Sequence, residues 1–570
     1  MSFKLSARER EVLRKLGEAI LPATDVLPVF GDRAIDQIET YLASGSAAEL
    51  RLLFKTALHM VERGAMLRHL RPMSKLPPEK RAAYIERHWV NGALPRRLMF
   101  RLFGVMLKGT YFDDPAVYAS LGLEHKKPEV KAERPRFMSQ VTRAKDLNED
   151  VEIEAEVVVI GTGAGGAAAA LELASRGNAV VMIEEGDYFA RDRFTGRGFE
   201  MQRLLYMNHG LTATVGNVAI PVPLGVTVGG STTVNSGTCF RTPARTLNRW
   251  RGALGLTAYT PEHLEPYLAK VEAVFQVKPA DAKYVGKNGE IIARGAGALG
   301  WSHGPIPRNA PDCDGQALCC FGCATGAKRS ADISFVPMAL EKGAQLLCRV
   351  KAERIILDGK RAAGVVGRSL DTGRKVRVKA RAVVLSMGAF GTPRFLMRQG
   401  ICNSSGRVGK NLSLHPATAM LALMDEPVEP QKSIPQGYMV DEFHEEGLLM
   451  EGSTLPLEMF TMMVPGVGRG AQEFMQNYRR ISSFGVMVCD TTRGHVLPDK
   501  IPQTPLAFYW LNRKDFALMR RGLSLLARIY LAAGAREIRA MIHGWKPMRS
   551  VADIEENMGR FVLPVDVDIS

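Results

Sequence analysis

The chain has 570 residues and a formal net charge of +16, a length that predicts about three or four domain-sized units. With 46% apolar and 24% charged residues and no low-complexity tract, the composition excludes a disordered or fibrous protein. The N-terminus lacks the apolar core of a secretory signal, and no run of about 18 apolar residues occurs. We therefore expect an intracellular, cytoplasmic protein that does not span a membrane.

The positive charge gathers in one part of the chain. Residues 51–111 contain thirteen Lys and Arg against three Glu, a local balance of +10. A basic surface of this kind can meet phosphate backbones or anionic lipid. No helix-turn-helix, zinc-finger or RNA-binding aromatic motif accompanies it. We expect no nucleic-acid partner, and we keep peripheral membrane contact through the N-terminal region as an expectation.

Residues 1–130 are predicted to form a helical N-terminal region. In the stretch SAREREVLRKLGEAILP, Ser6 suits the N-cap of a helix, Glu9 completes a capping box, and Pro22 ends the element.

A later helix of this region, in the stretch PRRLMFRLFGVMLKG, is predicted to be amphipathic and basic. Arg97, Arg101 and Lys108 follow one another at spacings of four and seven residues, which places them on one face. Such a helix either lies on a membrane surface or packs on the protein core with its basic face in solvent.

After a charged connecting segment at 131–150, the pattern changes to alternating strands and helices. The run AEVVVI is typical of a buried strand, AGGAAAALELASRG of a helix that Gly177 ends, and NAVVMIEEG of a second strand. This alternation predicts an α/β unit.

The turn between the first strand and its helix is rich in glycine. Gly161 permits a tight turn, Gly163 lets the backbone approach a pyrophosphate, and Gly166 allows close packing of helix and sheet. Glu184 ends the next strand, 23 residues beyond Gly161, where its carboxylate would accept a hydrogen bond from an adenosine ribose and repel a 2′-phosphate. The pattern predicts a dinucleotide site and leaves NAD and FAD open.

Two further stretches resemble the signatures of the glucose-methanol-choline (GMC) oxidoreductases. They are GVTVGGSTTVNSGTCFRTP at 225–243 and RAVVLSMGAFGTPRFLMRQGI at 381–401. Together with GRVGKNLSLHP at 406–416 and the helix RRGLSLLARIYLAAGAREI, the resemblance covers most of residues 151–545. It is strongest toward long-chain alcohol oxidases, which also carry a Cys-rich segment similar to FGCATGAK.

The resemblance implies fold, cofactor and chemistry. The implied fold class is α/β: an FAD-binding Rossmann-like domain, an α+β substrate domain with an antiparallel sheet, and the helical N-terminal region. The implied cofactor is FAD, which takes a hydride from the carbon of a small-molecule alcohol, of a long-chain or sterol-like kind, while a base takes the hydroxyl proton. The motifs leave open whether oxygen or another acceptor reoxidises the flavin.

Local chemistry agrees with these implied roles. Gly229 and Gly230 remove side chains where backbone approaches a flat isoalloxazine, and Asn235 is placed to bond its polar edge. In the second signature, Thr392 and Pro393 suit the N-cap and first position of a helix that Gly400 ends.

The expected division of the chain follows from these motifs. Its parts, in chain order, are a helical region (1–130), a linker (131–150), FAD binding (151–250), a substrate region with a cysteine cluster (251–345), FAD binding again (346–415), a substrate domain (416–540) and the start of an incomplete C-terminal segment (541–570).

Four cysteines crowd the substrate region: Cys313, Cys319, Cys320 and Cys323. Their spacings of six, one and three residues depart from a zinc ribbon and from the usual ferredoxin run. A zinc or iron-sulfur site, a local disulfide or redox pair, and a turn with reduced thiols all stay open. We favour the last and assign no metal site.

No catalytic residue is assigned. The resembled family places its catalytic His in an H-x-x-G motif shortly after the helix that matches LAAGAREI, and His415, His495 and His543 do not fit that pattern. We therefore expect that the sequence is truncated or that a separate polypeptide supplies the last segment. Two alternatives to an alcohol oxidoreductase stay open: a flavin-binding subunit without turnover and an NAD-dependent dehydrogenase.

Overall fold

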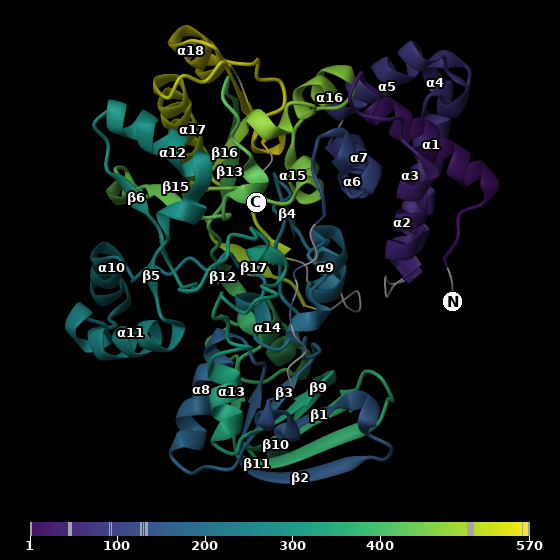
Figure 1. The fold of residues 1–570 in the computed structure, drawn as a ribbon. Coiled ribbons are helices and arrows are strands. Elements are labelled where there is room, and N and C mark those ends of the chain that lie inside the picture. The colour runs from purple at the N-terminus through teal and green to yellow at the C-terminus, as the bar shows by residue number, and fades with distance from the viewer. Residues whose placement is uncertain are drawn as a thin grey trace.

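The computed structural model describes residues 3–43, 48–90, 92, 94–125, 128, 130, 135–498, 507–560 and 562–567. Three parts lie together in Figure 1. An α/β part surrounds a seven-stranded sheet at the bottom of the view, a six-stranded antiparallel sheet lies above it, and the N-terminal helices flank the latter.

The N-terminal part is helical, as predicted. Ser6 Oγ accepts the N–H of Glu9 while the Glu9 carboxylate accepts the N–H of Ser6, so the predicted capping box is confirmed. The helices are α1 (Ala7–Ile20), α2 (Asp32–Ala43), α3 (Ala48–Gly64), α4 (Met66–His69), α5 (Pro78–Val90), α6 (Leu94–Phe112) and α7 (Pro115–Ser120).

The prediction that the basic face of α6 is exposed to solvent or lipid is wrong, because its cations contact other parts of the protein. Arg97 forms an ion pair with Asp566, and Arg101 Nη1 donates to the carbonyl of Val565 over 2.7 Å. Lys108 is buried and its Nζ donates to the carbonyl of Val464 over 2.6 Å. These cations therefore hold parts of the protein together.

The seven-stranded sheet runs in the order β1-β8-β3-β2-β11-β10-β9, with the first five strands parallel and the last two antiparallel. Helices α8 (Ala164–Ser175) and α13 (Phe335–Glu341) share a core with one face. Residues 157–160 of β2 and 180–183 of β3 are buried and form unbroken apolar runs, whereas β11 alternates apolar and charged residues. The strands are β1 (Val141–Arg143), β2 (Val151–Ile160), β3 (Val180–Glu184), β8 (Gln345–Cys348), β9 (Val350–Asp358), β10 (Arg361–Ser369) and β11 (Lys375–Leu385).

Helix α14 (Gly388–Gln399) follows β11 and starts earlier than predicted. Its N-cap is Met387, and Pro393 lies inside it, so the predicted start at Thr392 and Pro393 is wrong. Gly388, with a φ of 75°, turns the chain directly from strand to helix. Thr392 Oγ1 instead accepts the N–H of Met387 over 3.2 Å, and Gly400 ends the helix as predicted.

The six-stranded sheet has the order β19-β13-β16-β15-β14-β6, and each neighbouring pair of strands is antiparallel. Its residues alternate between two cores. Met420, Met450 and Phe484 share a core with α12 (Ala282–Ala298) and α17 (Arg513–Ala532), whereas Ala419 joins a second core. The strands are β6 (His303–Pro305), β13 (Ala417–Leu423), β14 (Tyr438–Val440), β15 (Leu448–Gly452), β16 (Ile481–Val488) and β19 (Glu537–Ala540).

The expected fold class is confirmed by these parts, while the domain boundaries stay predictions. Within the described residues, no helix is both long and apolar enough to cross a membrane. The remaining main elements are α9 (Gly198–Leu205), α10 (Ala244–Leu254), α11 (Pro261–Phe275), α15 (Leu457–Met463), α16 (Arg469–Met475), α18 (Val551–Gly559), β4 (Thr214–Val215), β5 (Lys278–Pro279), β7 (Pro307–Arg308), β12 (Lys410–Leu412), β17 (Gly494–Val496) and β18 (Ala507–Phe508).

Candidate functional site

The glycine turn between β2 and α8 fits its place only because it lacks side chains. Gly161 has a φ of 97°, and a Cβ added there would lie 2.4 Å from the carbonyl oxygen of Ser386 at the end of β11. A Cβ on Gly166 would lie 1.9 Å from the carbonyl oxygen of Gly161. The turn is thereby pressed between its own helix and the neighbouring strand end.

The N-terminus of α8 is open to a ligand. Its N-cap, Gly163, offers no side chain to the first N–H groups, and Ala164 and Gly165 are exposed. Unpaired N–H groups and the positive end of the helix dipole together favour an anion such as a pyrophosphate.

The second predicted glycine pair meets the first glycine turn. Gly230 has a φ of 53°, and a Cβ added there would lie 2.9 Å from the Cα of Gly163. Gly229 has a φ of 90°, and its N–H donates to Thr162 Oγ1 over 3.2 Å. The fold thus brings the predicted residues of two separate motifs into backbone contact.

Glu184 lies at the end of β3 and holds this junction. Its Oε2 accepts the N–H and the hydroxyl of Thr162 over 3.0 and 2.7 Å, and its Oε1 accepts the N–H of Gly186 over 2.8 Å. Burial raises the pKa of the Glu184 carboxyl, while these hydrogen bonds favour its ionised form. Each carboxylate oxygen can accept further hydrogen bonds, so the predicted ribose contact stays compatible and stays a prediction.

Asn235 is exposed beside the second glycine loop. Its backbone is fixed by Lys328, a buried cation that the sequence analysis did not assign to the site. Lys328 Nζ donates to the carbonyls of Thr232, Thr233 and Asn235 over 2.9, 2.9 and 2.7 Å. Burial lowers the pKa of this ammonium. Its only sequence signal is its place at the end of the FGCATGAK segment.

These loops fit an extended dinucleotide. Bare backbone is exposed at the α8 N-terminus and at the start of α14, and the two lie next to each other through the contacts of Gly161 and Gly166 with Ser386. The glycine-lined surface is free of bulky side chains, and the buried carboxylate of Glu184 lies next to it. The residues present therefore match what FAD requires of its binding loops.

The cysteine cluster lies next to Lys328. Cys313, Cys319 and Cys323 line a cavity of about 20 Å³, and Arg308 Nη2 donates to Cys319 Sγ over 3.1 Å. All eight cysteines are free thiols. Burial raises the pKa of Cys313 to about 11. Among the described residues no group of three or more His, Cys, Asp or Glu is arranged to hold a metal ion.

The three histidines discussed above lie outside the glycine loops. His415 is exposed in the segment before β13, and His495 is exposed on β17. His543 is buried, its N–H donates to the carbonyl of Asp566 over 2.7 Å, and its ring lies 6.5 Å from that of Trp89. No catalytic role is assigned to any of them.

Comparison with known proteins agrees with the geometry. The family model of GMC oxidoreductases matches residues 202–417, and that of FAD binding domains matches residues 156–194. The cofactor of this site is FAD.

Three proteins with similar sequences extend this comparison. It is 36% identical over 393 residues to a GMC-type oxidoreductase of Mycobacterium tuberculosis (69% of this chain, 62% of the relative). It is 31% identical over 387 residues to one of Sinorhizobium fredii (67% and 76%). It is 29% identical over 417 residues to a long-chain-alcohol oxidase of Arabidopsis thaliana (70% and 54%). The match thus spans 62% of the length of the mycobacterial relative.

A solved structure shares the fold. The pyridoxine 4-oxidase of Mesorbium loti superposes with a TM-score of 0.52 at 17% identity, covering 72% of this chain and 87% of the other.

Proposed function

This chain belongs to the GMC oxidoreductase family, and we propose that it oxidises the CH–OH group of a long-chain or sterol-like alcohol with FAD as cofactor. The observation that carries the flavin site is the backbone approach of Gly163 and Gly230, which joins two motifs into one glycine-lined surface. The similarity to a long-chain-alcohol oxidase supports the substrate class.

Each predicted residue has a task in this proposal. The N-terminus of α8 binds the pyrophosphate, Glu184 binds the ribose, and Asn235 orients the polar edge of the isoalloxazine. When bound, FAD supplies the acceptor for the hydride that leaves the carbinol carbon. The residues proposed to hold it are Gly161, Gly163, Gly166, Glu184, Gly229, Gly230 and Asn235.

The match to FAD binding domains argues against the NAD-dependent dehydrogenase. The remaining alternative is distinguished by experiment. A flavin-binding subunit without turnover would hold FAD, yet no alcohol would reduce it.

The test is anaerobic mixing of the purified, FAD-loaded chain with 1-dodecanol or a sterol. We expect the visible flavin absorption to bleach, and oxygen or an artificial acceptor to restore it. Gly163→Val, which should exclude the cofactor, is the control for colour. A yellow protein that no long-chain alcohol or sterol bleaches would contradict the proposed activity.

A further inference from the structure

Two buried cations hold the second glycine loop, and a cysteine sulfur lies beside them. Arg308 is 2% exposed and Lys328 is 1% exposed. Arg308 Nη2 donates to the carbonyl of Ser236 over 2.5 Å and to Cys319 Sγ over 3.1 Å. Lys328 Nζ donates to the carbonyl groups of residues 232, 233 and 235. The same two side chains therefore connect the Cys-rich turn with the loop that carries the expected flavin contacts.

The positive charge of these two side chains is not balanced by a carboxylate. The nearby buried carboxylate of Asp332 forms an ion pair with Arg191, and among the described residues no carboxylate forms an ion pair with Arg308 or Lys328. The Nε and Nη1 atoms of Arg308 are buried and have no hydrogen-bond partner in the described part of the chain. Because a buried unpaired cation is unfavourable, a negative charge on Cys319 Sγ would stabilise this part of the protein.

Cys319 is the cysteine that these cations favour as a thiolate. A guanidinium that donates to sulfur stabilises the thiolate, and the thiolate is the nucleophilic form of cysteine. By contrast, burial raises the pKa of Cys313 to about 11 and the pKa of Cys320 to about 12, so both hold their protons at neutral pH. The surroundings thus distinguish Cys319 from its neighbours in the cluster.

The cavity next to Cys319 has room for a small oxidant and contains a second thiol. Its volume of about 20 Å³ exceeds the roughly 10–15 Å³ that one water molecule needs, and hydrogen peroxide is only slightly larger than water. Cys323 lines the same cavity, and its Sγ accepts the N–H of Lys328 over 3.3 Å. The second thiol therefore belongs to the segment that positions Lys328.

We propose that Cys319 and Cys323 form a redox-sensitive pair, in which Cys319 reacts with hydrogen peroxide and then forms a disulfide with Cys323. The thiolate sulfur of Cys319 attacks one peroxide oxygen, the O–O bond breaks, and hydroxide leaves, which gives a sulfenic acid. The sulfur of Cys323 then attacks the sulfenic sulfur. The S–S bond forms, the S–O bond breaks, and the oxygen leaves as water with the thiol proton. The two cysteines lose two electrons, which reduce the peroxide.

Oxidation removes the anionic sulfur from its place beside the two cations. Arg308 loses the acceptor at Cys319, and the N–H of Lys328 loses the acceptor at Cys323. Since Arg308 and Lys328 fix the backbone of residues 232–236, oxidation should loosen the second glycine loop and weaken FAD binding about 10-fold or more. This inference goes beyond the proposed function and does not depend on which alcohol the protein oxidises.

The test treats the FAD-loaded protein with hydrogen peroxide and maps its cysteines by mass spectrometry. We expect a disulfide between Cys319 and Cys323, with release of FAD that dithiothreitol and added FAD reverse. Cys323→Ser should stop at the sulfenic acid of Cys319, which dimedone traps. Cys320→Ser is the matched control, because it changes the adjacent thiol, and it should form the same disulfide and release FAD as the wild type does.

Arg308 variants test the origin of the reactivity. Arg308→Met should slow dimedone labelling of Cys319 about 10-fold or more, and Arg308→Lys should restore part of the rate. Exposure alone predicts another pattern, in which the exposed Cys402 and Cys489 react first. Oxidation of these two without Cys319, or a disulfide that joins Cys313, would overturn the assignment. Full retention of FAD by the oxidised protein would overturn the link to the second glycine loop.

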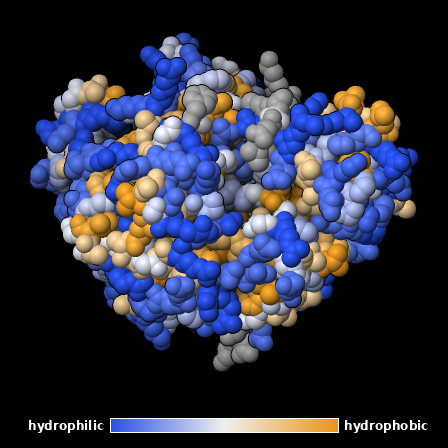
Figure 2. All heavy atoms as spheres, turned by 90° about the horizontal axis from the view of Figure 1, so that it is seen from above, coloured by the Kyte–Doolittle hydropathy of each residue, from blue (hydrophilic) through white to orange (hydrophobic). Residues whose placement is uncertain are grey.

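A second, independent observation concerns the surface of α3 and α4. Figure 2 shows hydrophobic residues gathered at the upper right, over the N-terminal helices. Leu67 and Leu70 are 84% and 88% exposed, and Leu53 and Met60, seven residues apart, share a face of α3. The leucine patch, as we name it, comprises the exposed apolar residues Leu52, Leu53, Met60, Met66, Leu67 and Leu70.

Exposed arginines accompany the leucine patch: Arg63, Arg68 and Arg71. An apolar surface with neighbouring cations matches an anionic membrane interface. Two copies of the patch would bring their arginines together, which disfavours a symmetric dimer. We infer that the leucine patch attaches the protein peripherally to anionic lipid, a role first expected for α6.

Sedimentation with vesicles tests this second inference. We expect binding to phosphatidylcholine vesicles only when phosphatidylserine is included, and weaker binding in high salt. Arg68→Gln with Arg71→Gln should weaken it roughly fivefold per arginine, and Leu67→Ser with Leu70→Ser should also weaken it. Leu254→Ser, at a leucine that is 63% exposed on α10, should have no effect. Equal sedimentation of all variants, or a dimer in gel filtration that Leu67→Ser dissolves, would overturn the inference.

Discussion

Replacing Gly163 by alanine separates cofactor contact from folding. The residue has an ordinary φ of −66°, and a Cβ there would find its nearest neighbour, the Cα of Gly230, 3.9 Å away. The protein alone therefore has room for the methyl group. We expect the unfolding free energy of the apoprotein to change by less than about 0.5 kcal/mol.

The cost should appear when FAD binds. A methyl group at the N-terminus of α8 displaces the pyrophosphate from at least one backbone N–H. A hydrogen bond to a charged group contributes about 1.5–3 kcal/mol, which corresponds to roughly a 10- to 150-fold weaker dissociation constant. Gly161→Ala should behave differently, because its Cβ would clash with Ser386 and its φ is left-handed, so it should destabilise the apoprotein itself.

The assay is a titration of apoprotein with FAD, followed by flavin fluorescence, beside urea unfolding of the same samples. Gly304→Ala is the matched control, because a Cβ there meets nothing within 4 Å and the residue lies on β6, in the other sheet. FAD binding of Gly163→Ala at wild-type strength would refute the reasoning, since this turn would then not hold the pyrophosphate.

Two further predictions concern buried carboxyl groups. Glu184→Ala should lower both FAD occupancy and apoprotein stability, because it removes a ribose acceptor and leaves the N–H groups of Thr162 and Gly186 without their partner; full occupancy by absorption would count against the ribose contact. Burial raises the pKa of Glu458 from 4.5 to about 7, so its folded form holds its proton more tightly than its unfolded form. Its contribution to stability is complete below about pH 4.5 and is lost as the pH rises through about 7. Urea unfolding between about pH 5 and pH 8 should show this decline, and Glu458→Gln should flatten it.

Local chemistry made parts of this molecule predictable. The capping box of Ser6 and Glu9 and the glycine turn at 161–166 are read from spacing alone, because the interacting groups lie within a few residues of one another. The buried end of β2, residues 157–160, and strand β3 were equally readable, since burial on both faces demands apolar runs. The family motifs added the second loop and the cofactor.

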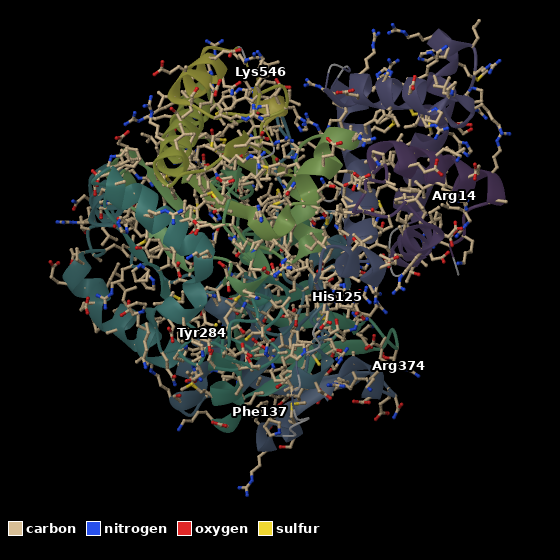
Figure 3. All side chains as sticks on the ribbon, turned by 45° about the horizontal axis from the view of Figure 1, so that its top comes forward. Arg14, His125, Phe137, Tyr284, Arg374 and Lys546 are labelled. Atoms are coloured by element: carbon tan, nitrogen blue, oxygen red, sulfur yellow. The ribbon has the colours of Figure 1, made fainter. Side chains whose placement is uncertain are left out.

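Contacts between distant segments were not predictable. Nothing local shows that Gly230 meets Gly163 or that Lys328 reaches the carbonyl groups of residues 232, 233 and 235. Nor does it show that Arg97 pairs with Asp566, 469 residues away. The start of α14 was missed because Pro393 favours a first helical position, whereas the left-handed Gly388 decided the turn. Figure 3 shows that side chains fill the space between the ribbons throughout the protein.

Lys108 provides the sharpest test that the basic face of α6 is structural. Its ammonium is buried, donates to the carbonyls of Val464 and Gly466 over 2.6 and 2.9 Å, and lies 5.3 Å from the ring of Trp89. Lys108→Met keeps the length of the side chain but leaves the buried carbonyl of Val464 and the half-buried carbonyl of Gly466 without this donor. Since a buried unsatisfied group costs about 1–3 kcal/mol, the loss at Val464 alone should lower the unfolding free energy measured in urea by about 1–3 kcal/mol. Arg96→Met, which removes an exposed cation from the same helix, should change it by less than about 0.5 kcal/mol. If both substitutions have the same small effect, the ammonium is solvated, and the original prediction of a solvent-facing basic stripe would be restored.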